Sequence, residues 1–218
     1  MTRPLHILIS AGPTREPIDR VRFLSNYSTG LMGSCLATEA IRRGHRVTLV
    51  SGPMSFPPPR RARIVWVEQA SQMQAALRQR LPKADVLIMA AAVCDFEPIR
   101  LMAGKLPRQG KLSLALKATP DIVANLPRRP GQLVVGFALE TNRPVERALA
   151  KLKRKHLDLI VGQHLNGTGT PFGKQRVKAF LLDASGVATL LGRISKTVLA
   201  RAILDKIEGL WYGQQKTK

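Results

Sequence analysis

Residues 85–93 read DVLIMAAAV, an apolar run with too little alternation for a strand that exposes one face. Such runs are typical of parallel strands that helices cover on both sides. Shorter strand-like runs lie before and after it, separated by segments with helical spacing. The pattern predicts an α/β fold built on a doubly wound, mainly parallel sheet.

The expected elements alternate along most of the chain. Strands are expected at 5–10, 47–51, 64–67, 85–93, 133–137 and 157–161. Helices are expected at 30–43, 69–81 and 145–156, the first ending at Gly44. Residues 177–183 and 187–191 flank Ser185-Gly186 and predict a C-terminal antiparallel hairpin, followed by a last helix at 196–210. An irregular stretch is expected between Glu97 and Thr119.

The composition bounds the class of protein. The 218 residues suit one large domain or two small ones, and a hydrophobic share of 44% argues against disorder. No apolar run approaches the 18 or so residues that a membrane helix needs. Neither a signal peptide nor a disulfide framework is expected, because the N-terminus has no small-residue cleavage site and the chain has two cysteines. The expected location is the cytoplasm.

The charge is strongly positive, with 35 Lys and Arg against 14 Asp and Glu and a formal net charge of +21. Such a surface attracts polyanions, so a basic nucleic-acid-binding protein is one alternative. However, the cations are spread along the chain, aromatic residues are 5%, and no metal-finger spacing or basic heptads occur. Nucleic acid is therefore not the expected partner, and an anionic substrate is the simpler interpretation.

Two loops of small residues follow the first expected strand. The first is SAGPTRE at 10–16, in which Gly12 and Thr14 permit close backbone approach and Arg15 could pair with phosphate. The second is NYSTGLMG at 26–33, which opens the first helix and offers N–H groups to an anion. The alternative for the second loop is a helix capped by Ser28 or Thr29.

Two familiar nucleotide sites are absent from the sequence. The dinucleotide fingerprint needs three glycines after the first strand, and Gly12 stands alone there. The phosphate loop needs Ser or Thr after Gly-Lys, but Lys105, Lys111 and Lys174 precede Leu, Leu and Gln.

Longer motifs nevertheless occur in one order over nearly the whole chain. They are TREPID at 14–19, VRFLSN at 21–26, STG at 28–30, MG at 32–33, RRG at 42–44, VTLVSGP at 47–53, AAAVCDF at 90–96, TPDIV at 119–123 and VGFALET at 135–141. These motifs strongly resemble the phosphopantothenoylcysteine synthetase family.

The resemblance implies a two-step ligation in coenzyme A biosynthesis, with 4'-phosphopantothenate, L-cysteine and CTP as substrates. The carboxylate of phosphopantothenate attacks the α-phosphate of CTP, pyrophosphate leaves, and the cysteine amine then displaces CMP from the acyl-cytidylate. The protein's task is positioning and charge stabilisation. Mg²⁺ is expected with CTP, held by phosphate oxygens and water, so no metal-binding side chain is predicted. No flavin is expected on this chain.

The resemblance also implies roles for individual residues. It assigns Lys105 to the first step, to offset charge on the phosphoryl group, and Asn26 to the second, where its amide would donate to an acyl or phosphoryl oxygen. The nucleotide-binding candidates are Met89, Ala90, Ala91, Asp95, Lys105, Pro120, Asp121, Ile122, Val123, Phe137, Lys151 and Lys155, with 120–123 expected to form a turn and a helix N-terminus. The phosphate-binding candidates are Gly12, Thr14, Arg15, Asn26, Ser28 and Gly30. A structural role for each of these residues, in the core, in a cap or on a solvated face, remains the alternative.

The sequence departs from the family pattern at four places. They are Leu31, Pro107, the GQH at 162–164 that replaces the usual Ala-Asn-Asp, and the KQR at 174–176. These departures leave open whether the nucleotide is CTP or ATP, and whether the chain completes the ligation or only binds its ligands. Residues 1–210 are expected to form a single Rossmann-like synthetase domain, with a polar tail at 211–218. We expect a stand-alone synthetase whose decarboxylase is a separate protein, and a homodimer that pairs through the C-terminal hairpin.

Overall fold

The computed structural model describes residues 3–108, 110–165 and 171–215. Its centre is an eight-stranded sheet in which β1 lies between β6 and β4. In spatial order the strands are β12 (Ala188–Ile194), β11 (Val177–Asp183), β10 (Leu159–His164), β9 (Leu133–Glu140), β6 (Val86–Met89), β1 (His6–Ala11), β4 (Arg46–Ser51) and β5 (Arg63–Trp66). Neighbours from β5 to β10 are parallel, and β11 and β12 add an antiparallel hairpin. The predicted doubly wound sheet is confirmed.

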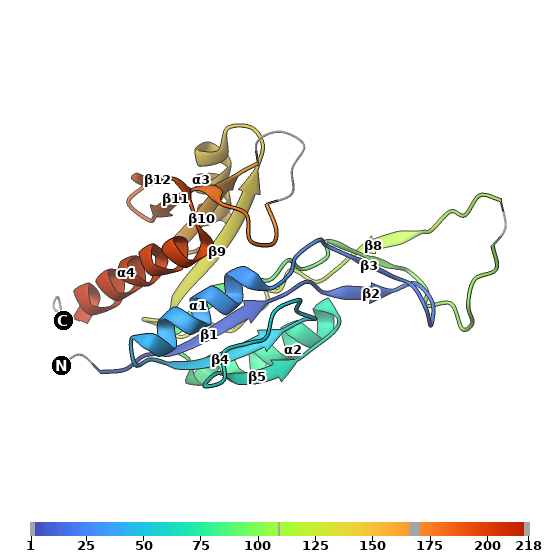
Figure 1. Cartoon of the computed structure of the whole chain (residues 1–218), viewed down its shortest axis with the longest axis horizontal. Helices are drawn as coiled ribbons and strands as arrows, with labels where there is room; N and C mark the ends of the chain where they lie inside the picture. The colour runs from blue at the N-terminus through green and yellow to red at the C-terminus, as the bar shows by residue number, and fades with distance from the viewer. Residues whose placement is uncertain (1–2, 109, 166–170, 216–218) are drawn as a thin grey trace.

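Helices cover both faces of this sheet (Figure 1). The first face packs against α1 (Leu31–Arg42) and α4 (Lys196–Gln215), and the second against α2 (Ala70–Arg80) and α3 (Pro144–Arg154). A short 3₁₀ helix, η1, spans Leu81–Lys83. Within β1, Ile7 and Ile9 belong to the first core and Leu8 to the second, as the period of two in a strand requires.

Two short hairpins form an arm that extends away from the sheet (Figure 1). The arm comprises the described residues of 15–25 and 96–118, with β2 (Arg15–Pro17) paired to β3 (Phe23–Ser25) and β7 (Phe96–Pro98) to β8 (Leu116–Ala118). Its two halves are joined at Leu106, whose N–H donates to Asp19 Oδ2 (3.0 Å) and whose carbonyl accepts from Arg22 (3.0 Å). The stretch expected to be irregular therefore contains paired strands, and β2 and β3 were not predicted.

The last helix is longer than predicted, since α4 continues to Gln215. Trp211 explains the extension, because its side chain is buried in the core between α4 and the sheet. Residues 211–215 are thus helical, and residues 216–218 of the predicted tail lie outside the described residues.

One glycine of β10 is required by its neighbour on β11. A Cβ at Gly162 would lie 2.0 Å from Cζ of Phe180, so the ring occupies the space that any other residue would need. Phe180 is buried in the core beneath α3.

Candidate active site

A cavity of about 710 Å³ opens where the parallel strands end. Its walls come from the segment after β6, from β9 and β10, from the start of α1, from α3, and from the turn at 119–123. The strand order reverses direction between β1 and β6, and open α/β sheets bind ligands at that point. The volume lies within the usual range for small-molecule sites.

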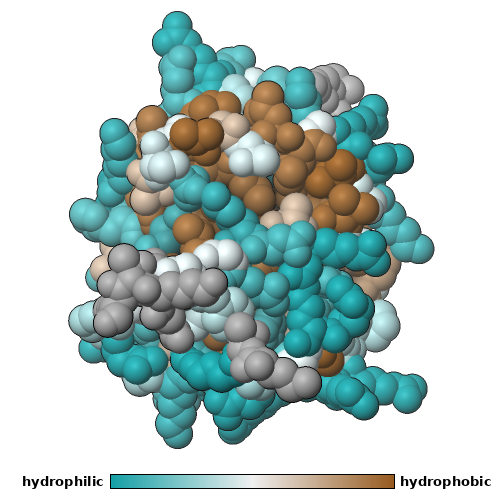
Figure 2. All heavy atoms as spheres, turned by 90° about the vertical axis from the view of Figure 1, so that its left-hand side faces the viewer, coloured by the Kyte–Doolittle hydropathy of each residue, from teal (hydrophilic) through white to brown (hydrophobic). Residues whose placement is uncertain are grey.

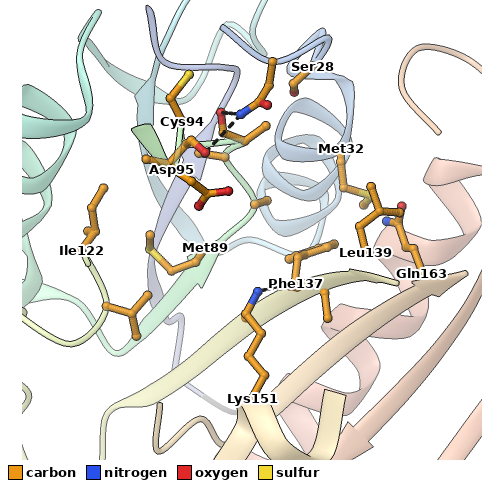
Figure 3. A pocket seen from close by; sticks show the side chains of 18 of the residues that line it. Ser28, Met32, Met89, Cys94, Asp95, Ile122, Phe137, Leu139, Lys151 and Gln163 are labelled. Atoms are coloured by element: carbon orange, nitrogen blue, oxygen red, sulfur yellow. Dashed lines mark hydrogen bonds between the residues drawn. The ribbon is translucent and has the colours of Figure 1, made fainter. Parts of the chain in front are cut away.

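Most of the predicted site residues line this cavity, although they come from distant parts of the chain. Those that do are Asn26, Ser28, Met89, Ala90, Ala91, Asp95, Pro120, Asp121, Ile122, Val123, Phe137, Lys151 and Lys155. Figure 3 shows Asp95, Met89, Phe137 and Lys151 around the same space. The structure therefore brings together the predicted nucleotide-binding set, with Lys105 as its exception.

The first small-residue loop does not line the cavity. Gly12 has φ +71° and packs against Gly52, so its place is explained by the turn after β1. Thr14 is buried, and its Oγ1 accepts a hydrogen bond from the N–H of Cys94 (2.9 Å). Arg15 lies over the ring of Phe23, 4.5 Å from its centroid. These placements favour the structural alternative for Gly12, Thr14 and Arg15.

Lys105 also lies outside the cavity. It is exposed in the loop of the arm between β7 and β8, and it has no hydrogen bond or ion pair with any described residue. The base of the arm does reach the cavity, since Phe96 and Ala118 line it. The family resemblance thus selected a lysine of the arm, not of the pocket wall.

Asn26 is held by its own amide group. Its Nδ2 donates hydrogen bonds to the carbonyls of Ala92 (3.0 Å) and Val93 (3.1 Å). Only the NH₂ end of a carboxamide can bond two carbonyls, so its oxygen is left as an acceptor at the cavity. The predicted donation from Asn26 to a ligand oxygen does not fit this arrangement.

Lys151 on α3 and Lys155, which directly follows that helix, bring positive charge to the cavity. Lys151 Nζ donates to the carbonyl of Phe137 (2.7 Å), and burial lowers the pKa of Lys151 below its ordinary value. Lys155 pairs with Asp121 at 3.0 Å. Burial alone would raise the pKa of Asp121, but hydrogen bonds from Lys155 and the N–H of Ala124 outweigh it and the net shift is downward.

Two helix termini differ from the sequence predictions. Residues 122–125 form a hydrogen-bonded turn rather than the start of a helix, with Asn125 N–H donating to the Asp121 carbonyl at 3.2 Å. At α1 the N-cap is Gly30, with φ +76° and no side-chain cap, so the proposed capping by Ser28 or Thr29 is wrong. Gly30 itself does not line the cavity, but Leu31 and Met32 in the first turn do.

Several lining residues were not predicted as site residues. They include Leu31, Met32, Thr119, Leu139, Gln163, Pro171, Phe172 and Lys196. In the sequence, Leu31 and Gln163 stand out only as departures from the family pattern. Gln163 lies near Leu139 and Met32 in Figure 3, and its side chain has no hydrogen-bond partner among the described residues.

Neither a metal-binding cluster nor a membrane-spanning helix occurs in the described residues. Among residues 3–108, 110–165 and 171–215, no group of three or more His, Cys, Asp or Glu side chains could hold a metal ion. In the same described part of the chain, no helix combines the length and apolarity needed to cross a membrane.

The fold and the cavity together define a doubly wound α/β protein with a ligand site at its switch point. The chain belongs to the family described as the DNA/pantothenate metabolism flavoprotein C-terminal domain, which matches residues 3–210.

Similar proteins cover nearly all of the chain. The coenzyme A biosynthesis bifunctional protein CoaBC of Bacillus subtilis is 39% identical over 208 residues, which are 94% of this chain and 51% of that protein. A cysteine/cysteine sulfinic acid decarboxylase from an unknown prokaryotic organism is 40% identical over 205 residues, 92% of this chain and 57% of that protein. The chain therefore spans a little over half the length of these relatives. A crystal structure of the C-terminal domain of CoaBC superimposes with a TM-score of 0.81 at 35% identity, covering 96% of both chains.

Proposed function

We propose that the chain is a phosphopantothenate–cysteine ligase of coenzyme A biosynthesis that uses CTP and acts in the cytoplasm. The observation that carries the proposal is the convergence of Asn26, Asp95, Lys151 and Lys155 on one cavity in a chain so similar to CoaBC. In the first step a carboxylate oxygen of phosphopantothenate attacks the α-phosphorus of CTP, and the bond to the leaving pyrophosphate breaks. In the second step the cysteine nitrogen attacks the acyl carbon, loses a proton, and CMP leaves.

The charged side chains around the cavity fit a nucleoside triphosphate as substrate. Lys151 and Lys155 offer ammonium groups to a triphosphate, and Asp95 offers carboxylate oxygens to ribose or base hydrogens. The apolar side chains of Met89, Ile122 and Phe137 suit the flat face of a base.

Mg²⁺ would enter with the nucleotide as part of the substrate. Among the described residues, only Asp95 and Asp121 bring carboxylates to the cavity, and Asp121 is paired with Lys155. This donor set fits an ion held largely by phosphate oxygens and water, which is the usual state of Mg²⁺ at nucleotides.

Asn26 is proposed to act as an acceptor. Because its two N–H groups are bonded to the Ala92 and Val93 carbonyls, its oxygen can orient the N–H of the attacking cysteine amine. Asn26→Asp would remove both anchoring donors, so it should spare pyrophosphate release and block amide formation.

The arm is proposed to join two copies of the chain. It carries eight of the exposed large apolar side chains: Val21, Phe23, Phe96, Ile99, Leu101, Met102, Leu112 and Leu116. A second cavity, of about 330 Å³, lies on it, lined by Ile99, Met102 and Leu112 among others. Such a surface on a projecting arm favours association.

A second surface competes for this role. Figure 2 shows apolar side chains on the end of the molecule opposite the arm, where α4 and the predicted C-terminal hairpin lie in Figure 1. The exposed large apolar residues there are Val187, Leu190 and Val198. We favour the arm because it also carries Lys105, which could then reach the cavity of the second copy. Light scattering should report a monomer for Leu101→Asp and a dimer for Leu190→Asp. A dimer for Leu101→Asp and a monomer for Leu190→Asp would instead place the interface at the C-terminal hairpin.

The decisive experiment measures pyrophosphate release with phosphopantothenate and Mg²⁺, with CTP and ATP compared, before and after cysteine is added. We expect release with CTP that depends on phosphopantothenate, and then amide and CMP once cysteine is present. If folded protein binds one of the nucleotides but releases no pyrophosphate with either, the result would instead support a family member that binds without ligation.

A further inference from the structure

Lys196 is a buried cation at the edge of the cavity. It is the first residue of α4 and is only 7% exposed. Its Nζ donates to the carbonyls of Pro171 (2.8 Å) and Gly173 (2.7 Å), which tie the loop at 171–173 to the helix. Pro171, Phe172 and Lys196 all line the cavity.

This is an unfavourable place for a positive charge. The N-terminus of a helix carries a partial positive charge, and the first turn of α4 has no acidic residue to offset it. No carboxylate of a described residue lies within ion-pair distance of Lys196, and burial lowers the pKa of its ammonium. A neutral side chain would avoid these costs, so the lysine must provide something in return.

The two carbonyls indicate what it provides. A charged donor binds carbonyl oxygens more strongly than a neutral donor does. One side chain therefore holds the loop at two carbonyl groups, one on either side of Phe172. The loop lies with Phe137, Gln163 and Lys151 on the walls of the cavity, the side to which the proposed function assigns the nucleotide.

We infer that Lys196 is a positioning residue that holds the 171–173 loop as a ready-made wall of the nucleotide site. A wall fixed before binding need not be ordered by the ligand, which improves affinity without any contact between lysine and ligand. This inference rests on the proposed function for the identity of the ligand.

The test compares Lys196→Met with Lys196→Arg, which keeps a charged donor, and with Lys206→Met, a lysine of the same helix that pairs with Asp183 instead. Calorimetry gives Kd for CTP and for phosphopantothenate, and hydrogen exchange of the amides of 172–176 is followed in ligand-free protein. We expect Lys196→Met to accelerate that exchange and to raise Kd for CTP about tenfold, while Kd for phosphopantothenate is unchanged. Lys196→Arg should keep most of the affinity for CTP and most of the protection from exchange. Lys206→Met should have the same Kd and the same exchange as the unmodified chain.

Three results would overturn the inference. They are unchanged exchange in Lys196→Met, faster exchange with an unchanged Kd for CTP, and a weakened Kd for phosphopantothenate alone. The second of these would leave Lys196 with a purely structural role. If Lys196→Met does not fold, Lys196→Gln gives the same comparison with a neutral donor.

Failure of the proposed function is separable from these outcomes. An unmodified chain that binds neither CTP nor ATP would remove the ligase proposal. The exchange measurement would still decide whether Lys196 fixes the loop.

Discussion

The end of the molecule formed by α1 and α4 and the arm at the opposite end differ in how their charged side chains are paired. Between α1 and α4, Arg43 contacts Glu39 (2.9 Å), Asp205 (2.8 Å) and Glu208 (2.8 Å), and His45 Nε2 lies 2.8 Å from Glu208. On the arm the exposed cations without an ion pair among the described residues are Arg20, Arg100, Lys105, Arg108 and Lys111. One end satisfies its charges internally, and the other leaves them for something outside the chain.

Apolar side chains differ between the core of the helical end and the arm, although Val187, Leu190 and Val198 of the helical end are also exposed. Those of α1 and α4 that face the sheet are buried, such as Leu36 and Ile203, whereas Leu101 and Leu112 of the arm are 64% and 59% exposed. Stability and function are therefore expected to separate along the long axis of the molecule. Substitutions at the helical end should change the free energy of unfolding, and substitutions on the arm should change activity.

The largest expected effect is on the arm. Lys105→Gln removes the ammonium proposed to offset phosphoryl charge, and we expect pyrophosphate release to fall about 10²–10³-fold, as for loss of other transition-state donors. The melting temperature should stay unchanged because Lys105 is exposed and has no partner among the described residues. Lys111→Gln, on the same loop, is the matched control and should keep its activity. Equal activity of the two variants would remove Lys105 from the mechanism.

The second effect compares leucines at the two ends. Leu36→Ala should reduce the free energy of unfolding by about 2–5 kcal/mol, because it opens a cavity at a fully buried position. Leu101→Ala should change it by less than about 0.5 kcal/mol in dilute protein. Urea unfolding of both variants checks the pair, and similar costs would mean that the arm is part of the cooperative core.

The smallest effect concerns acid. Hydrogen bonds from Arg42 come first among the interactions that lower the pKa of Glu39 from 4.5 to about 2, and burial only partly opposes them. A carboxylate with a lowered pKa stabilises the fold above its ordinary pKa, and that contribution is lost as the pH falls from 4.5 towards 2. Glu39→Gln should therefore cost about 1–2 kcal/mol at pH 7 and distinctly less at pH 3. An equal cost at both pH values would show that the charge of Glu39 does not matter.

The sequence predicted the parts of the site that depend on strand ends. The run at 85–93 and the motif at 135–141 form the parallel strands β6 and β9 or follow them, so their residues reach one edge of the sheet together. The motif at 119–123 reaches the cavity differently, because it follows β8 of the antiparallel hairpin in the arm. The arm could not be predicted in the same way, because its strands have three residues each and are too short for periodicity. Its halves meet through contacts such as Asp19 to Leu106, 87 positions apart.

Lys196 and Gln163 had no local signal of function. Lys196 resembles any lysine that opens a helix, and its role becomes visible only when the loop at 171–173 is placed beside it. Lys105 shows the converse, since the family resemblance selected the residue but could not say whether it reaches a cavity.

The contact between Gly162 and Phe180 links two positions in any attempt to change the proposed nucleotide side of the cavity. Grafting the Ala-Asn-Asp pattern onto 162–164 would place a methyl group where the Phe180 ring already lies. The graft must therefore carry a smaller residue at 180, and a chain that acquired the alanine first would lose packing before it gained any new specificity. Positions 162 and 180 are therefore expected to be coupled. A stepwise change from Gly-Gln-His to Ala-Asn-Asp at 162–164 is expected to begin with a smaller residue in place of Phe180.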